Sequence, residues 1–261
     1  MSKKLRVVIV GSGKLAWHLA PAIENSGHPI VGIYSRNKTN AENLCSRLYN
    51  AEVLSSPDFN EINPDVILIS VSDHAIEIVS NELAFPSESI IAHTAGGRNA
   101  ELLNNHCNYG VFYPLQTFSK DRKINFEEIP ILLEYNNDYS GDALTLLANG
   151  ISTKVFIADS EERNLIHLAA VFACNFTNHL LALSNNFLEE SNIDFNLIKP
   201  LIQETFAKAV SADPKHMQTG PAIRKDKETL EKHLQLLDEK PELKKIYKLL
   251  SESIIRLAEQ K

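Results

Sequence analysis

Three polar side chains in apolar surroundings are candidates for moving a proton or orienting a substrate: His93, His167 and Asn175. His93 ends an apolar run, and the other two lie in the long apolar stretch 165–183. An imidazole can give or take a proton near neutral pH, and an amide can hold a substrate by hydrogen bonds. The alternative role is structural, because buried polar side chains also pair with one another. The sequence therefore predicts three catalytic residues and leaves a packing role open for each.

Helical spacing relates His167 to two asparagines. Residues of an α-helix advance about 100° each, so Asn175 and Asn178 return to within roughly 80° and 20° of His167. All three are expected on one face. His167 and Asn178 are about 16 Å apart along the axis, so one reacting atom cannot touch both. We therefore expect Asn178 to serve packing or a neighbouring subunit.

Further polar residues could line a substrate site: Tyr113, Gln116, Thr117 and Arg224. The first three belong to the end of the predicted strand 109–113 and the turn after it, which should stand beside His93. The guanidinium of the fourth could hold a substrate carboxylate. The alternative for that arginine is a surface ion pair with Asp226 or Glu228, in a segment expected to open a helix.

A glycine-rich turn predicts a phosphate site near the N-terminus. The apolar run 5–10 breaks into Gly-Ser-Gly-Lys-Leu-Ala and continues with a helical pattern. In a dinucleotide-binding fold the first glycine makes the turn, the second lets a pyrophosphate approach, and the alanine lets the helix pack closely. The amino end of the helix adds free N–H groups and a partial positive charge. The predicted cofactor contacts here are Gly11, Ser12, Gly13, Lys14, Leu15 and Ala16.

The end of the predicted strand 29–34 indicates which dinucleotide binds. An acid there would bind the ribose 2′-hydroxyl of NAD, but the chain has Ser35, Arg36 and Asn37. Since a guanidinium can hold a 2′-phosphate with two parallel hydrogen bonds, NADP is preferred over NAD. A solvated basic loop is the alternative, and the missing acid also argues against S-adenosylmethionine. Three strand-end residues complete the predicted cofactor contacts: Val71, Ser72 and Thr94.

The composition is that of an ordinary globular chain, with 261 residues, 44% hydrophobic content and a formal net charge of −7. The charges form no basic stripe, which argues against nucleic acid or an anionic membrane as partner. Three widely spaced cysteines predict neither a disulfide framework nor a zinc site, and no metal is expected. The apolar run near the N-terminus is too short for a signal peptide. We expect a cytoplasmic protein in which 165–183 is a buried helix, because its histidines and asparagines would be costly in lipid.

Alternating apolar runs and helical patterns predict an α/β fold with a parallel, doubly wound Rossmann-type sheet, followed by an all-helical domain. Strands are expected near 5–10, 29–34, 66–71, 89–93, 109–113, 129–134 and 153–157. Helices are expected between them at 39–49, 73–84 and 138–149, and beyond them at 159–190, 194–211, 221–237 and 241–259. Asp159 and Glu162 predict a capping box where the helical part begins. The predicted domains are 1–157, which binds the dinucleotide, and 158–261, which serves substrate binding and dimerisation.

With these motifs in view, the whole chain resembles oxidoreductases that join a Rossmann-like, NADP-binding domain to a helical domain of unknown function. They are distant relatives of 6-phosphogluconate dehydrogenase and pyrroline-5-carboxylate reductase. The resemblance rests on the segments 11–16, 93–96 and 114–118, on Asn175, and on 219–226. It implies an NADP-dependent oxidoreductase that acts on a small carbonyl, imine or hydroxyl substrate in a cleft between the domains, and a homodimer formed by the helical domain. A noncatalytic NADP-binding sensor or scaffold is the alternative.

Two positions depart from this family. The related dehydrogenases carry a lysine four residues before an asparagine in the first helix of the second domain, whereas this chain has Val171 before Asn175. His167, one turn earlier, could take over as the acid–base group. The family often has a histidine before Pro-Leu-Gln-Thr-Phe, where Tyr113 stands here. A catalytic role for that position is therefore open.

Overall fold

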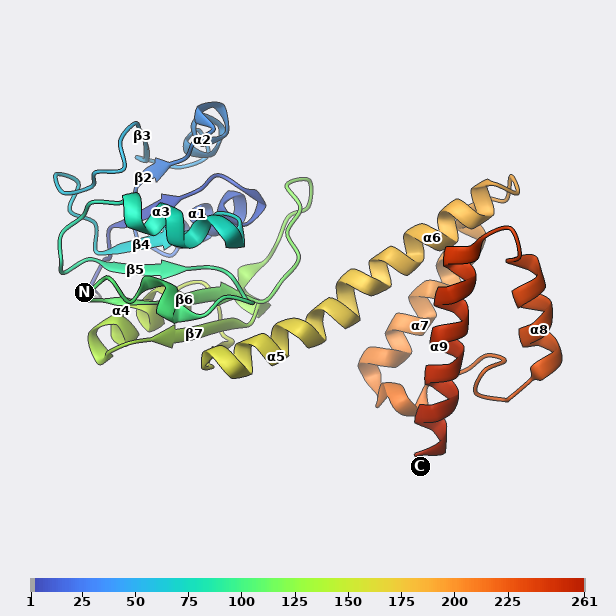
Figure 1. The fold of residues 1–261 in the computed structure, drawn as a ribbon. Helices are drawn as coiled ribbons and strands as arrows, with labels where there is room; N and C mark the ends of the chain where they lie inside the picture. The colour runs from blue at the N-terminus through green and yellow to red at the C-terminus, as the bar shows by residue number, and fades with distance from the viewer. Residues whose placement is uncertain (1–2, 261) are drawn as a thin grey trace. The chain divides into compact units, whose positions relative to one another are not determined.

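The computed structural model describes residues 3–260 and divides into two compact units, Met1–Phe172 and Ala173–Lys261. The first unit contains an eight-stranded sheet in the order β3-β2-β1-β4-β5-β6-β7-β8. Figure 1 labels β3, β2, β4, β5, β6 and β7 in this order across the sheet. Its strands are β1 Val7–Val10, β2 Ile30–Tyr34, β3 Glu52–Leu54, β4 Val66–Ile69, β5 Ile90–His93, β6 Tyr109–Pro114, β7 Ile131–Tyr135 and β8 Val155–Ile157. The predicted α/β fold with a Rossmann-type sheet is confirmed.

Two features of the sheet differ from the prediction. β7 pairs with β6 in the antiparallel direction, whereas the other neighbouring strands are parallel. The chain between β6 and β7 contains only the short 3₁₀ turn η3, Phe126–Glu128, and no crossover helix of the kind that usually joins parallel strands. The edge strand β3 was not predicted, because its three residues form no apolar run long enough to indicate a strand.

Helices cover both faces of the sheet. These are α1 Lys14–Asn25, α2 Lys38–Cys45, α3 Ile76–Glu82 and α4 Asp138–Asn149, with the 3₁₀ turns η1 Asp73–Ala75 and η2 Ala100–Leu103. Side chains alternate along each strand, so Val7 and Ile9 pack with α1, α2 and α4, while Val8 and Val10 pack with α3 and η2. Burial on both faces explains why the strands read as continuous apolar runs.

A continuous helical stretch follows β8: α5 Ser160–Ala170, the π-helical segment η4 Val171–Phe176, and α6 Thr177–Glu189. The predicted capping box of Asp159 and Glu162 is confirmed. The compact units divide inside η4, one helix later than the boundary predicted at 157/158. Because π-helical hydrogen bonds run from i to i+5, the α-helical angles that related His167 to Asn175 and Asn178 do not apply across this segment.

The prediction that 165–183 is a buried helix is wrong for the single chain, in which Leu165 and Leu168 are more than half exposed. By length and composition, Ser160–Glu189 could cross a membrane, with a window of mean hydropathy 1.4. Helices of soluble proteins that pack on other protein surfaces can have the same length and apolar composition. α5 packs in this way in part, because Arg163 is buried and bonded to Glu134 of β7.

The second unit is helical, as predicted. It contains η5 Phe195–Ile198, α7 Lys199–Ser211, η6 Pro214–His216, α8 Lys227–Leu236 and α9 Pro241–Glu259. The helix expected from residue 221 begins only at Lys227, because Gly220 and Lys225 adopt positive φ angles of 105° and 54°. Asp226 then caps α8, its side chain accepting a hydrogen bond from the backbone N–H of Thr229. Among the described residues of this unit, only Ala222 and Leu237 are buried.

Candidate functional site

A cavity of about 600 Å³ opens at the carboxyl ends of β1, β2, β4 and β5. This is the edge at which open parallel sheets bind their ligands. It is lined by eleven of the predicted cofactor residues: Gly11, Ser12, Gly13, Lys14, Leu15, Ser35, Arg36, Asn37, Val71, Ser72 and Thr94. The exception is Ala16, which is fully buried against the sheet, as close helix–strand packing requires.

The two glycines of the turn have different roles in this cavity. Gly11 adopts φ +113°, and a Cβ atom there would lie 2.1 Å from the carbonyl oxygen of Ser70, so only glycine fits between β1 and the end of β4. A Cβ atom at Gly13 would meet nothing within 4 Å. Gly13 is also the N-cap of α1, whose first turn carries no acidic side chain. The helix therefore presents free N–H groups and its positive end to open space, which suits an anion.

The end of β2 forms one side of the cavity. The hydroxyl of Ser35 lies 2.8 Å from that of Ser12. Asn37 caps α2, its side-chain oxygen accepting from the backbone N–H of Asn40. Arg36 is exposed and lines the cavity, while Lys38 is not among the lining residues and lies 4.0 Å from Glu42. Arg36 is thus the cation of this turn that can reach a ligand in the cavity.

His93 lies at the end of β5 and is fully buried. Its Nδ1 accepts a hydrogen bond from the backbone N–H of Ala95 at 3.2 Å, and its Nε2 lies 3.2 Å from the carbonyl oxygen of Asn99, to which it can donate. Burial above all holds the pKa of His93 down to about 4, with the charges of Arg163 and Arg98 adding to the shift and the bond to Asn99 opposing it. A proton-donating role does not fit this burial, whereas orienting the loop that follows β5 does.

The burial of His93 leads to a pH-dependent stability. A histidine has a pKa of 6.5 when unfolded and about 4 here, so the unfolded chain binds more protons between those values. Stability is therefore lost as the pH falls from about 6.5 to about 4, by about 3 kcal/mol from this residue. In His93→Asn, which keeps an acceptor for Ala95, the free energy of unfolding measured with urea should fall less over this range. An unchanged pH slope would contradict the assignment.

Tyr113 and His167 form a pair beside the cavity. The hydroxyl of Tyr113 lies 3.1 Å from Nδ1 of His167, and the rings meet edge to face with centroids 6.0 Å apart. Gly96 supplies the space, since a Cβ atom there would lie 2.5 Å from Cζ of Tyr113 and 2.7 Å from Nδ1 of His167. Burial raises the pKa of Tyr113, and Asp73 raises it further, against the opposing charge of Arg163.

Sequence reasoning missed Arg163, which joins α5 to β7 and to the loop after β5. Its guanidinium bonds the carboxylate of Glu134, donates to the carbonyl oxygen of Arg98 at 2.5 Å, and donates to the hydroxyl of Ser160 at 3.1 Å. That hydroxyl in turn donates to Glu134 at 2.8 Å. The sequence did contain one sign of its role. Arg163 lies near the amino end of a helix, where the helix dipole disfavours a cation, so an acidic partner could have been expected.

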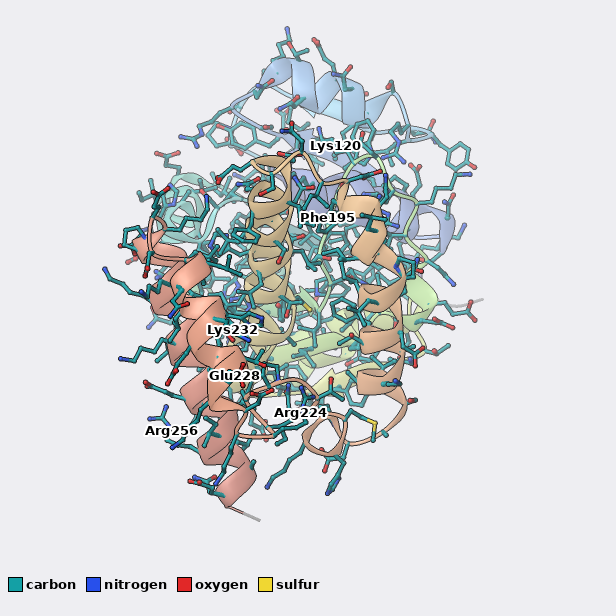
Figure 2. All side chains as sticks on the ribbon, turned by 90° about the vertical axis from the view of Figure 1, so that its right-hand side faces the viewer. Lys120, Phe195, Arg224, Glu228, Lys232 and Arg256 are labelled. Carbon is teal, nitrogen blue, oxygen red and sulfur yellow. The ribbon has the colours of Figure 1, made fainter. Side chains whose placement is uncertain are left out.

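The other predicted site residues are dispersed. Gln116 and Thr117 are exposed, and the side chain of Gln116 accepts from the backbone N–H of Thr117 at 2.8 Å. Asn175 and Arg224 are exposed in the second unit. Figure 2 labels Arg224 together with Glu228 and Lys232 of α8. The acids proposed as ion-pair partners of this arginine have other partners, since Glu228 pairs with Lys232 at 2.7 Å and Asp226 caps α8.

Comparison with known proteins relates both parts of the chain to described domains. A Rossmann-like domain matches residues 1–117, and DUF2520, a domain of unknown function, matches residues 129–254. A crystal structure from Bacteroides fragilis, of a protein provisionally described as an NADP oxidoreductase, is 36% identical and covers 97% of this chain and 98% of its own, with a TM-score of 0.86. The chain belongs to this Rossmann-like DUF2520 family. The predicted family is therefore confirmed.

More distant structures share the fold of this DUF2520 protein. A reductive aminase from Aspergillus terreus, in complex with NADPH and ethyl-5-oxohexanoate, is 15% identical with a TM-score of 0.69, covering 97% of this chain and 94% of its own. An imine reductase from Myxococcus stipitatus, in complex with NADP⁺, is 15% identical with a TM-score of 0.62, covering 98% and 93%. The chain matches none of the curated proteins with which it was compared.

The two matched regions of the DUF2520 protein meet at the pair described above. Tyr113 belongs to the Rossmann-like match and His167 to the DUF2520 match, yet both lie in the first compact unit. The cavity is lined entirely by residues of the Rossmann-like match. In this family member, α5 therefore brings a DUF2520 side chain to the sheet that carries the cavity.

Proposed function

We propose that this protein is an NADP-dependent oxidoreductase acting on a small carbonyl, imine or hydroxyl substrate. The observation that carries the proposal is the cavity, where an open helix amino end stands at one side and Arg36 at the other, at a strand end without an acid. This arrangement suits a pyrophosphate and a 2′-phosphate. The description of the Bacteroides fragilis relative as an NADP oxidoreductase supports the same cofactor.

The residues present fit this cofactor. The turn 11–15 would hold the pyrophosphate, Ser35–Asn37 the 2′-phosphate, and Val71, Ser72 and Thr94 the parts nearer the nicotinamide. When bound, NADPH supplies a hydride. The protein must then align the substrate and provide a proton, and His167 is the proposed source of that proton. The cleft between domains and the substrate contacts of Gln116, Thr117, Asn175 and Arg224 stay predictions.

The test is a titration of the purified protein with NADPH and with NADH at fixed salt, followed by a screen for NADPH consumption. We expect NADPH to bind at least about tenfold more tightly than NADH, because a charge-assisted contact to the 2′-phosphate is available to it alone. Small keto acids, aldehydes and imines form the substrate panel. Failure of both cofactors to bind would reject the proposal. Selective binding of NADPH without turnover of any panel member would favour the sensor or scaffold instead.

We also propose that the protein is a homodimer formed by its helical part. In the second unit, Leu201 is 67% exposed and Val210 84% exposed, and the helices α6, α8 and α9 line an apolar cavity of about 450 Å³. A unit with so few buried side chains requires a partner to cover its apolar surface. Light scattering after size exclusion should give twice the chain mass of 29.2 kDa, and a monomer at micromolar concentration would contradict the proposal. A cytoplasmic location stays a prediction.

A further inference from the structure

We propose that Tyr113 delivers the proton to the substrate and that His167 resupplies it. The inference rests on the proposed function and adds the proton route. The hydroxyl of Tyr113 lies 3.1 Å from Nδ1 of His167, although the two residues are 54 positions apart in the chain. The glycine between them leaves the space that lets the two rings meet.

The pair lies beside the nicotinamide end proposed for the cavity. Thr94 and Ala95 line the cavity, and the next residue, Gly96, is the one whose added Cβ would strike both rings. Asp73, which also lines the cavity, is close enough to affect the charge of Tyr113. The proposal places the substrate between this end of the cavity and the phenol. His93, the other candidate acid, is fully buried and has both ring nitrogens engaged by backbone groups.

The electrostatic environment decides the direction of proton flow. Burial and the nearby Asp73 both oppose a negative charge on the Tyr113 oxygen, while Arg163 partly offsets them. A phenolate left after proton donation would therefore be costly. The cost disappears if Tyr113 regains a proton in the same step, and the group positioned to supply it is His167 in its protonated form.

In the reduction of a carbonyl or imine, bound NADPH would supply the hydride that the substrate carbon accepts. The O–H bond of Tyr113 breaks as its proton bonds to the substrate oxygen or nitrogen. The Nδ1–H bond of His167 breaks as that proton restores the tyrosine hydroxyl. The products are an alcohol or amine, oxidised nicotinamide, neutral Tyr113 and neutral imidazole. Tyr113 touches the substrate and is the catalytic residue, whereas His167 acts through it and is a positioning residue.

The chain offers a matched pair of glycines for the test. Gly96→Ala would force Tyr113 and His167 apart, whereas a Cβ atom at Gly97 would make an ordinary contact, 3.4 Å from Cδ2 of His167. We expect Tyr113→Phe and Gly96→Ala to lower kcat at least about 100-fold, within the range typical of general acid catalysis, with NADPH affinity unchanged. Gly97→Ala should stay within about threefold of wild type in both measurements.

His167→Gln tests the proton route by the pH dependence of kcat, which a purely structural role of His167 would leave unchanged. In the wild type, kcat should depend on pH, while in the variant kcat should be low and independent of pH. If Tyr113→Phe keeps at least half of the wild-type kcat, the proton route is overturned while the proposed function stands. If wild-type protein turns over no member of the panel, the proposed function falls and the proton route with it.

Discussion

Replacement of Arg163 by methionine should lower the free energy of unfolding of the first unit by about 3 kcal/mol. The guanidinium is fully buried, bonds the carboxylate of Glu134 and donates to Arg98 and Ser160. Its removal leaves a largely buried carboxylate without its cation. Since Glu134 remains 21% exposed and can recruit water, we expect the lower end of the range typical of broken buried ion pairs.

Urea denaturation followed by tryptophan fluorescence measures this effect selectively. The one tryptophan of the chain, Trp17, lies on α1 in the first unit. The double variant Arg163→Met with Glu134→Leu should recover much of the loss, because no charge is then left without a partner. Arg122→Met makes the same chemical change at an exposed position and should stay within about 0.5 kcal/mol of wild type. A loss below about 1 kcal/mol in Arg163→Met would show that the network contributes little.

Replacement of Arg36 by alanine should weaken NADPH binding about 30- to 100-fold and leave NADH within about threefold of its wild-type affinity. Arg36 lines the cavity at the end of β2, where the proposed 2′-phosphate would lie. A bidentate, charge-assisted contact to that phosphate contributes about 2 to 3 kcal/mol. NADH has a hydroxyl in its place and should lose little.

A neighbouring lysine provides the control for charge. Lys38→Ala removes the same formal charge two positions along the chain, but this residue is not among those lining the cavity and lies 4.0 Å from Glu42. Calorimetry at fixed salt should show less than about a threefold change for either cofactor, because exposed charges act weakly at a distance. Equal losses of NADPH and NADH affinity in Arg36→Ala would mean that the arginine holds another part of the cofactor.

Much of the fold could be predicted from local sequence patterns. The glycine-rich turn, the strand ends around it and the capping box of Asp159 depend on residues close together in the sequence. The structure contains the capping box, and the turn and strand ends line one cavity. The errors arose where local patterns compete with tertiary context. The helix predicted from residue 221 begins at Lys227, since a turn with positive φ angles precedes it. The π-helical segment after Ala170 changes the angles between the side chains before and after it, which an ideal α-helix would have kept.

The sequence by itself determined that this chain folds into a Rossmann-type sheet followed by helices, and that the turn at Gly11 and the arginine after β2 belong to one candidate site, whose residues line a common cavity. Both follow from periodicity and short-range spacing, which a single sequence displays. Only the tertiary structure decided the state of the candidate acids. It buried His93 with both nitrogens bonded, and it brought Tyr113 to His167 and Glu134 to Arg163 across long stretches of chain. Burial and long-range pairing depend on which elements pack together, so no local pattern encodes them.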